Sequence, residues 1–261
     1  LKAVGEEEGE KIFYLTAKTI TRQVAEDAMT ALKDTGAEVK SVTLTAKDKI
    51  CFLDETTCNP DQCPYANGYY NRINEGLWDL LNHENQITRE VIETYARKHT
   101  LCPFELSLDV SIWCDVIIGD YNYLFDPTVY LRRFFEDEKN EDYLFLIDEA
   151  HNLVNRSREM YSAELSYEKT KRSKEAIPKE FKKLHRRFNK LLKEFDTIRE
   201  IAKEDHWDYH HQKAPAESLV KAGYQLSEKI KECLAEFPEH PSQEQLLPYY
   251  FDLLHFLKVS E

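Results

Sequence analysis

Short apolar runs alternate with amphipathic stretches through the first 160 residues of the chain. Apolar or β-branched runs bounded by polar residues predict strands, and apolar residues recurring every three or four positions predict helices. Strands are expected at 12–16, 39–45, 113–118 and 143–148, and helices at 18–34, at 86–99 and within 122–135. Because strands that alternate with helices form parallel sheets, this part of the chain is expected to have an α/β fold.

Three of these segments carry finer expectations about burial. On the helix over 18–34, one face is formed by Ile20, Val24, Ala28 and Ala31 or Leu32. The helix over 86–99 is expected to point Ile87, Val91 and Tyr95 inward. The run 143–148 is the most continuously apolar strand candidate, and its composition predicts a buried strand.

The strand pattern stops after residue 160. Helices are predicted over 178–203, 215–235 and 243–259, with polar and proline-containing segments between them. The first carries an apolar stripe of Phe181, Leu184, Phe188, Leu191 and Leu192. Such a stripe is typical of a helix packed on one side, so a separate all-helical domain is expected over 161–261.

Glycine is scarce, with seven in 261 residues. No glycine precedes a lysine, so the chain has no G-x-x-x-x-G-K-[ST] phosphate loop, and it has no G-x-G-x-x-G motif. A complete P-loop NTPase or Rossmann dehydrogenase is therefore excluded for this chain by itself. The chain begins at Leu1 rather than Met, and we interpret it as an excised piece of a longer protein.

The net charge of −13 argues against a general nucleic-acid coat, which would be basic. The charge is uneven, however, because Lys169–Lys193 holds eleven basic and two acidic side chains, a local net charge of +9. Within this run, the side chains that lie largely off the apolar stripe include Lys182, Lys183, Arg186 and Arg187. They form either an ordinary solvated helix face or a surface that faces nucleic-acid phosphates.

No apolar stretch approaches the roughly 20 residues that a membrane helix needs, and no signal-peptide pattern opens the chain. We therefore expect no membrane partner, and a cytoplasmic protein, or a nuclear one in a eukaryote. In that setting the six cysteines are expected to be reduced thiols, available for metal binding or catalysis.

Four of the cysteines cluster in a segment, residues 46–107, that interrupts the strand and helix rhythm. Cys51, Cys58, Cys63 and Cys102 have the spacing C-x6-C-x4-C-x38-C. Four thiolates fit a [4Fe–4S] cluster. Zinc is the competing metal, although its sites usually have tight C-x2-4-C pairs, and four unrelated buried thiols are the simplest alternative. We interpret Cys114 and Cys233 as buried thiols of that kind.

Aromatic side chains surround Arg72 in the same segment: Tyr65, Tyr69, Tyr70 and Trp78. Aromatic rings and an arginine can stack on the bases of single-stranded nucleic acid. The same residues can instead form a small core around a metal site. Core packing is the better interpretation for Tyr65, and both remain open for Tyr69, Tyr70 and Arg72.

The predicted strand before Asp148 is followed by Asp148-Glu149-Ala150-His151. Ligands of open parallel sheets bind at the carboxyl ends of the strands. An aspartate there can hold Mg²⁺ together with nucleotide phosphates, and a neighbouring glutamate can orient or deprotonate an attacking water. His151 can then sense the γ-phosphate or couple to a neighbouring motif. The simpler alternative is an acidic helix N-terminus.

These motifs, in this order, are similar to those of the XPD/DinG family of superfamily 2 iron–sulfur DNA helicases. Thr16-Ala17-Lys18-Thr19 resembles helicase motif Ia. The four-cysteine insertion follows, then the segment 114–126, and then the Asp148–His151 motif, so the resemblance covers about residues 11–160. The helical tail resembles that family's arch domain by its position and its helicity.

The resemblance implies four segments and a fold. The first RecA-like motor domain would begin over 1–45, be interrupted by the iron–sulfur domain over 46–107, and resume over 108–160. An all-helical arch domain would occupy 161–261. The fold class is therefore α/β, a partial RecA-like parallel sheet with an iron–sulfur insertion and a helical domain after it.

The resemblance also implies roles. The longer protein would use ATP and Mg²⁺ to travel 5′→3′ on DNA, with Asp148 holding Mg²⁺, Glu149 activating water and His151 completing the motif. Thr16 and Lys18 would lie along the DNA backbone, and the [4Fe–4S] and arch domains would split single-stranded from duplex DNA at a fork. The P-loop and the second motor domain are missing, so the fragment is expected not to hydrolyse ATP.

Two other classes compete with this interpretation. One is an iron–sulfur nuclease, which also combines four cysteines with carboxylates. The other is a non-catalytic scaffold whose insertion is stiffened by zinc. A redox enzyme fits least, because no flavin or nicotinamide motif is visible in the sequence.

Overall fold

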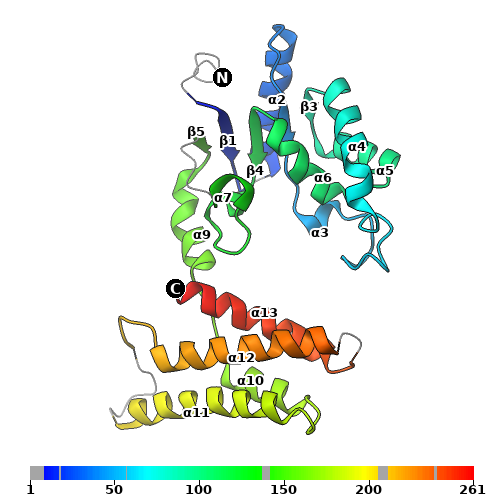
Figure 1. Cartoon of the computed structure of the whole chain (residues 1–261). Coiled ribbons are helices and arrows are strands. Elements are labelled where there is room, and N and C mark those ends of the chain that lie inside the picture. The colour runs from blue at the N-terminus through cyan, green and yellow to red at the C-terminus, as the bar shows by residue number, and fades with distance from the viewer. Residues whose placement is uncertain (1–8, 18, 57, 137–141, 205–210, 238–239) are drawn as a thin grey trace. The chain divides into compact units, whose positions relative to one another are not determined.

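The computed structural model describes residues 9–17, 19–56, 58–136, 142–204, 211–237 and 240–261. The chain divides into two compact units, the first made of residues 1–125 and 129–154 and the second of residues 126–128 and 155–261. Figure 1 shows the sheet and the helices of each unit. The expectation of an α/β fold with a helical domain is confirmed.

The first unit contains a five-stranded sheet in which all paired strands are parallel. The strands are β1 (Lys11–Leu15), β2 (Ser41–Thr43), β3 (Gln86–Ile87), β4 (Val116–Gly119) and β5 (Tyr143–Ile147). Their order across the sheet is β3-β2-β4-β1-β5. Ile12 is opposite Val116 on one side and Leu144 on the other, which fixes β1 between β4 and β5.

Helices connect these strands. They are α2 (Thr19–Asp34), α3 (Lys47–Ile50), α4 (Tyr69–His83), α5 (Arg89–His99), α6 (Pro103–Val110), α7 (Asn122–Phe125) and α8 (Arg132–Phe135). The helices α3 to α6 belong to the cysteine-rich insertion. Because β3 lies inside that insertion and pairs with β2, the insertion contributes to the sheet itself.

The second unit is helical. Its helices are α10 (Tyr167–Glu175), α11 (Lys182–Glu204), α12 (Glu217–Glu236) and α13 (Gln243–Val259), and α9 (Leu153–Met160) crosses the boundary between the units. The core includes Phe188, Leu191, Leu226 and Leu253, which are fully buried. The apolar stripe on α11 is therefore confirmed as a core-facing side.

Two expectations about burial are wrong. The strand β5 lies at the edge of the sheet, and its Phe145 and Leu146 are 42% and 52% exposed among the described residues. On α2, Ile20 and Val24 are exposed, and the side that packs on the sheet carries Ala25 and Met29 instead. Apolar content identified both elements but did not identify which surface a neighbour covers.

The predicted helix over 86–99 is also partly wrong. Ile87 belongs to β3, and only after Thr88 does the chain become helical. The buried side of α5 is formed by Ile92 and Ala96. The short strand was missed because two residues carry too little periodicity to be distinguished from the first turn of a helix.

None of the described helices is both long enough and apolar enough to cross a lipid bilayer.

Candidate functional site

All four clustered cysteines line one cavity of about 270 Å³ in the first unit. Cys51 directly follows α3, and Cys102 is the N-cap residue of α6. Cys63 is buried in a turn where its N–H donates to the Asn59 carbonyl at 2.8 Å. The thiols are free, and Cys58 is the exposed one of the four. Three separate stretches of chain thus bring four sulfurs to one cavity.

Arg72 on α4 ties two of these stretches together. Its Nη2 donates to the carbonyl oxygens of Asn67 at 2.6 Å and Thr100 at 2.7 Å. Asn67 ends the turn that holds Cys63, and Thr100 lies two residues before Cys102. The guanidinium is therefore engaged with backbone carbonyls, and these bonds leave it less available to DNA bases. Its contact with DNA bases stays a prediction.

Tyr69 and Tyr70 both line the cavity but have different surroundings. Tyr69 is buried, its hydroxyl donates to Asp109 Oδ2 at 2.7 Å, and burial followed by that bond raises the pKa of Tyr69. Tyr70 is 86% exposed. Of the two predicted stacking residues, only Tyr70 presents a ring to solvent.

Lys47 lies at the same cavity and was not singled out from the sequence. Its Nζ is 3.8 Å from Cys58 Sγ and 3.8 Å from a Glu105 carboxylate oxygen. The ammonium group thus adds a positive charge to the wall of the cysteine cavity. The helix pattern around Lys47 is only four residues long, so the sequence contained no signal for this placement.

Cys114 is separate from this group. It is fully buried, and its Sγ lies 3.4 Å from the Val110 carbonyl oxygen. Burial raises the pKa of the Cys114 thiol to about 12. A thiol of this kind is protonated and inert at neutral pH, in agreement with its interpretation as a core residue.

The second group of predicted residues lies where the strands end. The Thr16 N–H donates to the Gly119 carbonyl at 2.9 Å, and the Asp148 N–H donates to the Leu15 carbonyl at 2.9 Å. These bonds align the carboxyl ends of β1, β4 and β5, which is the edge where open parallel sheets bind ligands.

Asp148 has a carboxylate oxygen suited to a cation. Its Oδ2 is buried and has no hydrogen-bond partner among the described residues. Its backbone carbonyl accepts a bond from the buried hydroxyl of Tyr121. Burial, and then the negative charge of Asp148, raise the pKa of Tyr14. An orphaned buried carboxylate oxygen beside a strand end fits Mg²⁺, which prefers such ligands together with phosphate oxygens.

Glu149 and His151 complete the motif in different environments. Glu149 has a left-handed backbone with φ of 46°, and its Oε2 accepts a bond from Asn152 Nδ2 at 3.0 Å. A residue other than glycine rarely adopts this conformation, and such strain is concentrated at functional sites. His151 is exposed.

Thr16 and Lys18 are the two DNA contacts predicted in the motif-Ia segment, and the structure describes the first of them. Thr16 is almost fully buried, and its hydroxyl contacts that of Thr21. Lys18 lies outside the described residues. The Thr16 N–H is engaged with the Gly119 carbonyl, so a DNA contact at Thr16 stays a prediction.

The predicted basic residues of the second unit all lie on α11. Lys183, Arg186 and Arg187 line an open groove of about 590 Å³, and Lys182 and Lys183 border a neighbouring cavity. Arg187 Nη1 donates to Gln225 Oε1 on α12 at 2.8 Å. Lys183, Arg186 and Arg187 thus share one groove, whereas Lys182 lines only the neighbouring cavity, and the DNA contact of these four residues stays a prediction.

Comparison with known proteins gives this arrangement a family context. The DEAD_2 family model matches residues 35–170. The Saccharomyces cerevisiae protein named general transcription and DNA repair factor IIH helicase subunit XPD/RAD3 is 29% identical over 120 residues, which are 46% of this chain and 15% of the yeast protein. An Anopheles gambiae regulator of telomere elongation helicase 1 homolog is 27% identical over 167 residues, covering 59% of this chain and 16% of that protein.

A solved structure titled "Truncated XPD" superposes with a TM-score of 0.54 at 15% identity. The match covers 99% of this chain and 72% of that one. At this identity the similarity concerns the fold alone, and it includes both the sheet-containing and the helical parts of the chain. The matched regions span only about one sixth of the length of the curated relatives.

Proposed function

The chain belongs to the DEAD_2 family of XPD-like helicases, and from that premise we propose that it is the cluster-bearing and arch-bearing part of an ATP-dependent 5′→3′ DNA helicase. The observation that carries the proposal is the cysteine cavity: four thiols from three separate stretches converge within an insertion of a parallel sheet. The same sheet carries Asp148 and Glu149 at its carboxyl edge.

We propose that Cys51, Cys58, Cys63 and Cys102 hold a [4Fe–4S] cluster. Four thiolates are the donor set of such a cluster. All four line one cavity of about 270 Å³. Their loose spacing, C-x6-C-x4-C-x38-C, lacks the tight C-x2-4-C pairs that zinc sites usually have, which favours the cluster over zinc. The bound cluster would cross-link the insertion.

The chain's own residues would then present DNA to that insertion. Tyr70, exposed beside the cavity, offers a ring for base stacking. Arg72 holds the two cysteine-bearing stretches at fixed separation. The basic surface of α11 would attract the phosphates of single-stranded or forked DNA. In this scheme the protein acts where DNA is, in the cytoplasm or in the nucleus of a eukaryote.

At the sheet edge, Asp148 would hold Mg²⁺ through its unpartnered Oδ2, and Glu149 would orient or deprotonate the attacking water. The bound ion would neutralise charge on the ATP phosphates. His151, exposed next to them, would contact the γ-phosphate side. No P-loop occurs in this chain, so we expect it to bind DNA without hydrolysing ATP.

The test is to purify the chain without oxygen and measure iron, sulfide, zinc and absorbance near 400 nm. We expect about four irons per chain. The Cys63→Ser variant should lose them, and the Cys233→Ser variant should keep them. One zinc and no iron per chain would refute the cluster and favour a zinc-stiffened, non-catalytic scaffold. Metal-dependent nicking of DNA by the same sample would favour a nuclease, and DNA-stimulated ATP hydrolysis would refute the expected inactivity.

A further inference from the structure

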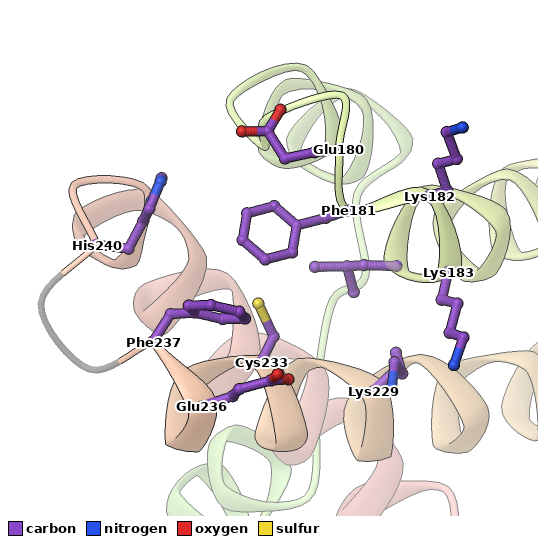
Figure 2. A pocket seen from close by; sticks show the side chains of 10 residues that line it. Glu180, Phe181, Lys182, Lys183, Lys229, Cys233, Glu236, Phe237 and His240 are labelled. Atoms are coloured by element: carbon purple, nitrogen blue, oxygen red, sulfur yellow. The ribbon is translucent and has the colours of Figure 1, made fainter.

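A cavity of about 640 Å³ opens on the helical unit, and the proposed function uses its lysines on α11 but not its aromatic side chains. It lies between the first turn of α11, the last turns of α12 and the segment at His240, as Figure 2 shows. Cavities that hold small ligands commonly have volumes of about 300–1,000 Å³. Its size therefore admits one nucleotide-sized group.

The apolar part of the cavity is mainly aromatic. The ring of Phe181 lies 5.1 Å from that of Phe237 and 5.7 Å from that of His240, with interplanar angles of 77° and 86°. Figure 2 shows the three rings meeting at one end of the cavity. Phe237 is 38% exposed. Each edge-to-face contact covers one ring face and leaves the others open, and the exposed part of Phe237 is where a flat ligand can stack.

The charged part of the cavity carries three lysines, Lys182, Lys183 and Lys229, and two carboxylates, Glu180 and Glu236, and it adjoins the basic groove on α11. Lys183 and Lys229 line both hollows, and the groove adds Arg186, Arg187 and Lys190. Its five basic residues are accompanied by one carboxylate, Glu232, which pairs with Lys229. Like charges three or four residues apart on a helix destabilise it. An anionic ligand would relieve that repulsion.

The spacing of these cations matches a run of phosphates. Lys183 and Lys190 are seven residues apart on one helix, a rise of about 10 Å. A nucleic-acid strand carries a phosphate about every 3.4 Å in a duplex, and at longer intervals when it is extended, so two or three phosphates fit this span. Gln225 holds Arg187 and Lys190 in place at 2.8 and 2.9 Å.

We propose that this cavity receives one base of a single-stranded nucleic acid, stacked among Phe181, Phe237 and His240, while the neighbouring phosphates lie along the basic groove. The inference rests on the proposed function and assigns a base-binding pocket to the helical unit. An acidic peptide with an aromatic anchor is the competing ligand. Among the described lining residues three carry rings and Leu184 is the one aliphatic hydrocarbon side chain, which favours a base.

The experiment compares two fluorescein-labelled strands of equal length, oligo-dT and its fully abasic counterpart, bound to the intact chain at fixed salt. Both carry the phosphates, and only the first carries bases. Phe237→Leu should weaken oligo-dT binding about fivefold or more and leave abasic binding unchanged, because a base stacked on an aromatic ring contributes at least that factor. Phe251→Leu, an exposed phenylalanine on α13 outside the cavity, is the matched control and should change neither.

Charge variants test the groove separately. Replacing Arg186 and Arg187 with alanine should weaken both strands equally and reduce the salt slope by about 0.7 for each phosphate that the variant no longer neutralises. Lys221→Ala, an exposed α12 lysine outside both hollows, is the control. Thermal unfolding of each variant shows that the fold is intact.

Three results would overturn the inference. One is an oligo-dT to abasic affinity ratio that Phe237→Leu leaves unchanged. Another is Phe237-dependent binding of an oligo-glutamate peptide carrying one tryptophan, without Phe237-dependent binding of oligo-dT. Either can occur in a protein that holds iron and binds DNA, so the proposed function would stand. If the unaltered chain binds neither strand, the pocket and the DNA-binding part of the proposed function fail together.

Discussion

Gly76 allows α4 to lie against the segment that carries Cys102. A Cβ added at Gly76 would lie 2.4 Å from Leu101 Cδ1 and 3.6 Å from His99 Cβ. Leu101 is fully buried, so a shift of its methyl group must be absorbed by the surrounding core side chains. We therefore expect Gly76→Ala to disturb the packing of α4 against the Cys102 segment.

Two effects of opposite sign determine the result. Alanine in place of glycine inside a helix stabilises by about 1 kcal/mol. Overpacking a filled core destabilises by about 1–3 kcal/mol. We expect the steric clash to outweigh the propensity, which leaves a net destabilisation of about 1 kcal/mol. In urea, with a slope of about 1–3 kcal/mol per molar, the midpoint should fall by several tenths of a molar.

Urea unfolding of Gly76→Ala, Leu101→Val and the double variant measures this coupling. Valine lacks the δ-methyl groups of leucine, so the double variant should lose less stability than the two single changes together. Iron content should follow the same order, because Leu101 precedes Cys102. A higher urea midpoint for Gly76→Ala, or strictly additive losses in the double variant, would show that the clash is not limiting.

Three further predictions concern the insertion. Hydrogen bonds from Lys98 and His99 lower the pKa of Asp79 to about 2, below its unfolded value of about 3.9. The stabilisation that Asp79 provides is thus present above about pH 4 and lost as the pH falls towards 2. In Asp79→Asn the urea midpoint should therefore fall less between pH 4 and pH 2 than in the unaltered chain, and an equal fall would contradict this. Tyr70→Ala should weaken single-strand binding at constant stability, whereas Tyr69→Phe should cost about 1.5–3 kcal/mol of stability; equal effects on DNA affinity would contradict the assignment. Arg72→Lys should lower iron content, since an ammonium cannot keep the planar two-sided contact with the carbonyls; full iron occupancy would show that the tether is dispensable.

Local chemistry is readable from the sequence. The clustering of four cysteines predicts one site, and the four line one cavity. The apolar run before Asp148 predicts a strand end there, and Asp148 follows β5 directly. Both inferences depend on short-range features, a strand followed by acidic residues and cysteines within one insertion, which the chain carries in nearby positions.

Long-range neighbours are not readable in the same way. Phe145 and Leu146 have the composition of a buried strand, yet β5 lies at the sheet edge because strand order depends on residues far away. Arg72 has the surroundings of a base-stacking residue in the sequence, and its carbonyl partner Thr100 is 28 residues away. The aromatic cavity near Phe237 joins two segments separated by more than fifty residues, and the helical periodicity of each segment alone describes only its packing.

The strand order has a consequence for the order of folding. β1 and β2 are consecutive in the sequence but do not pair, because β4 lies between them. β1 therefore gains its first neighbour only after about 100 further residues have been synthesised, which takes roughly 5–20 s at a typical translation rate. Cys51, Cys58, Cys63 and Cys102 all precede β4. The four cysteines thus leave the ribosome before β1 can pair with β4, so the proposed cluster would have its complete set of ligands before the sheet is complete.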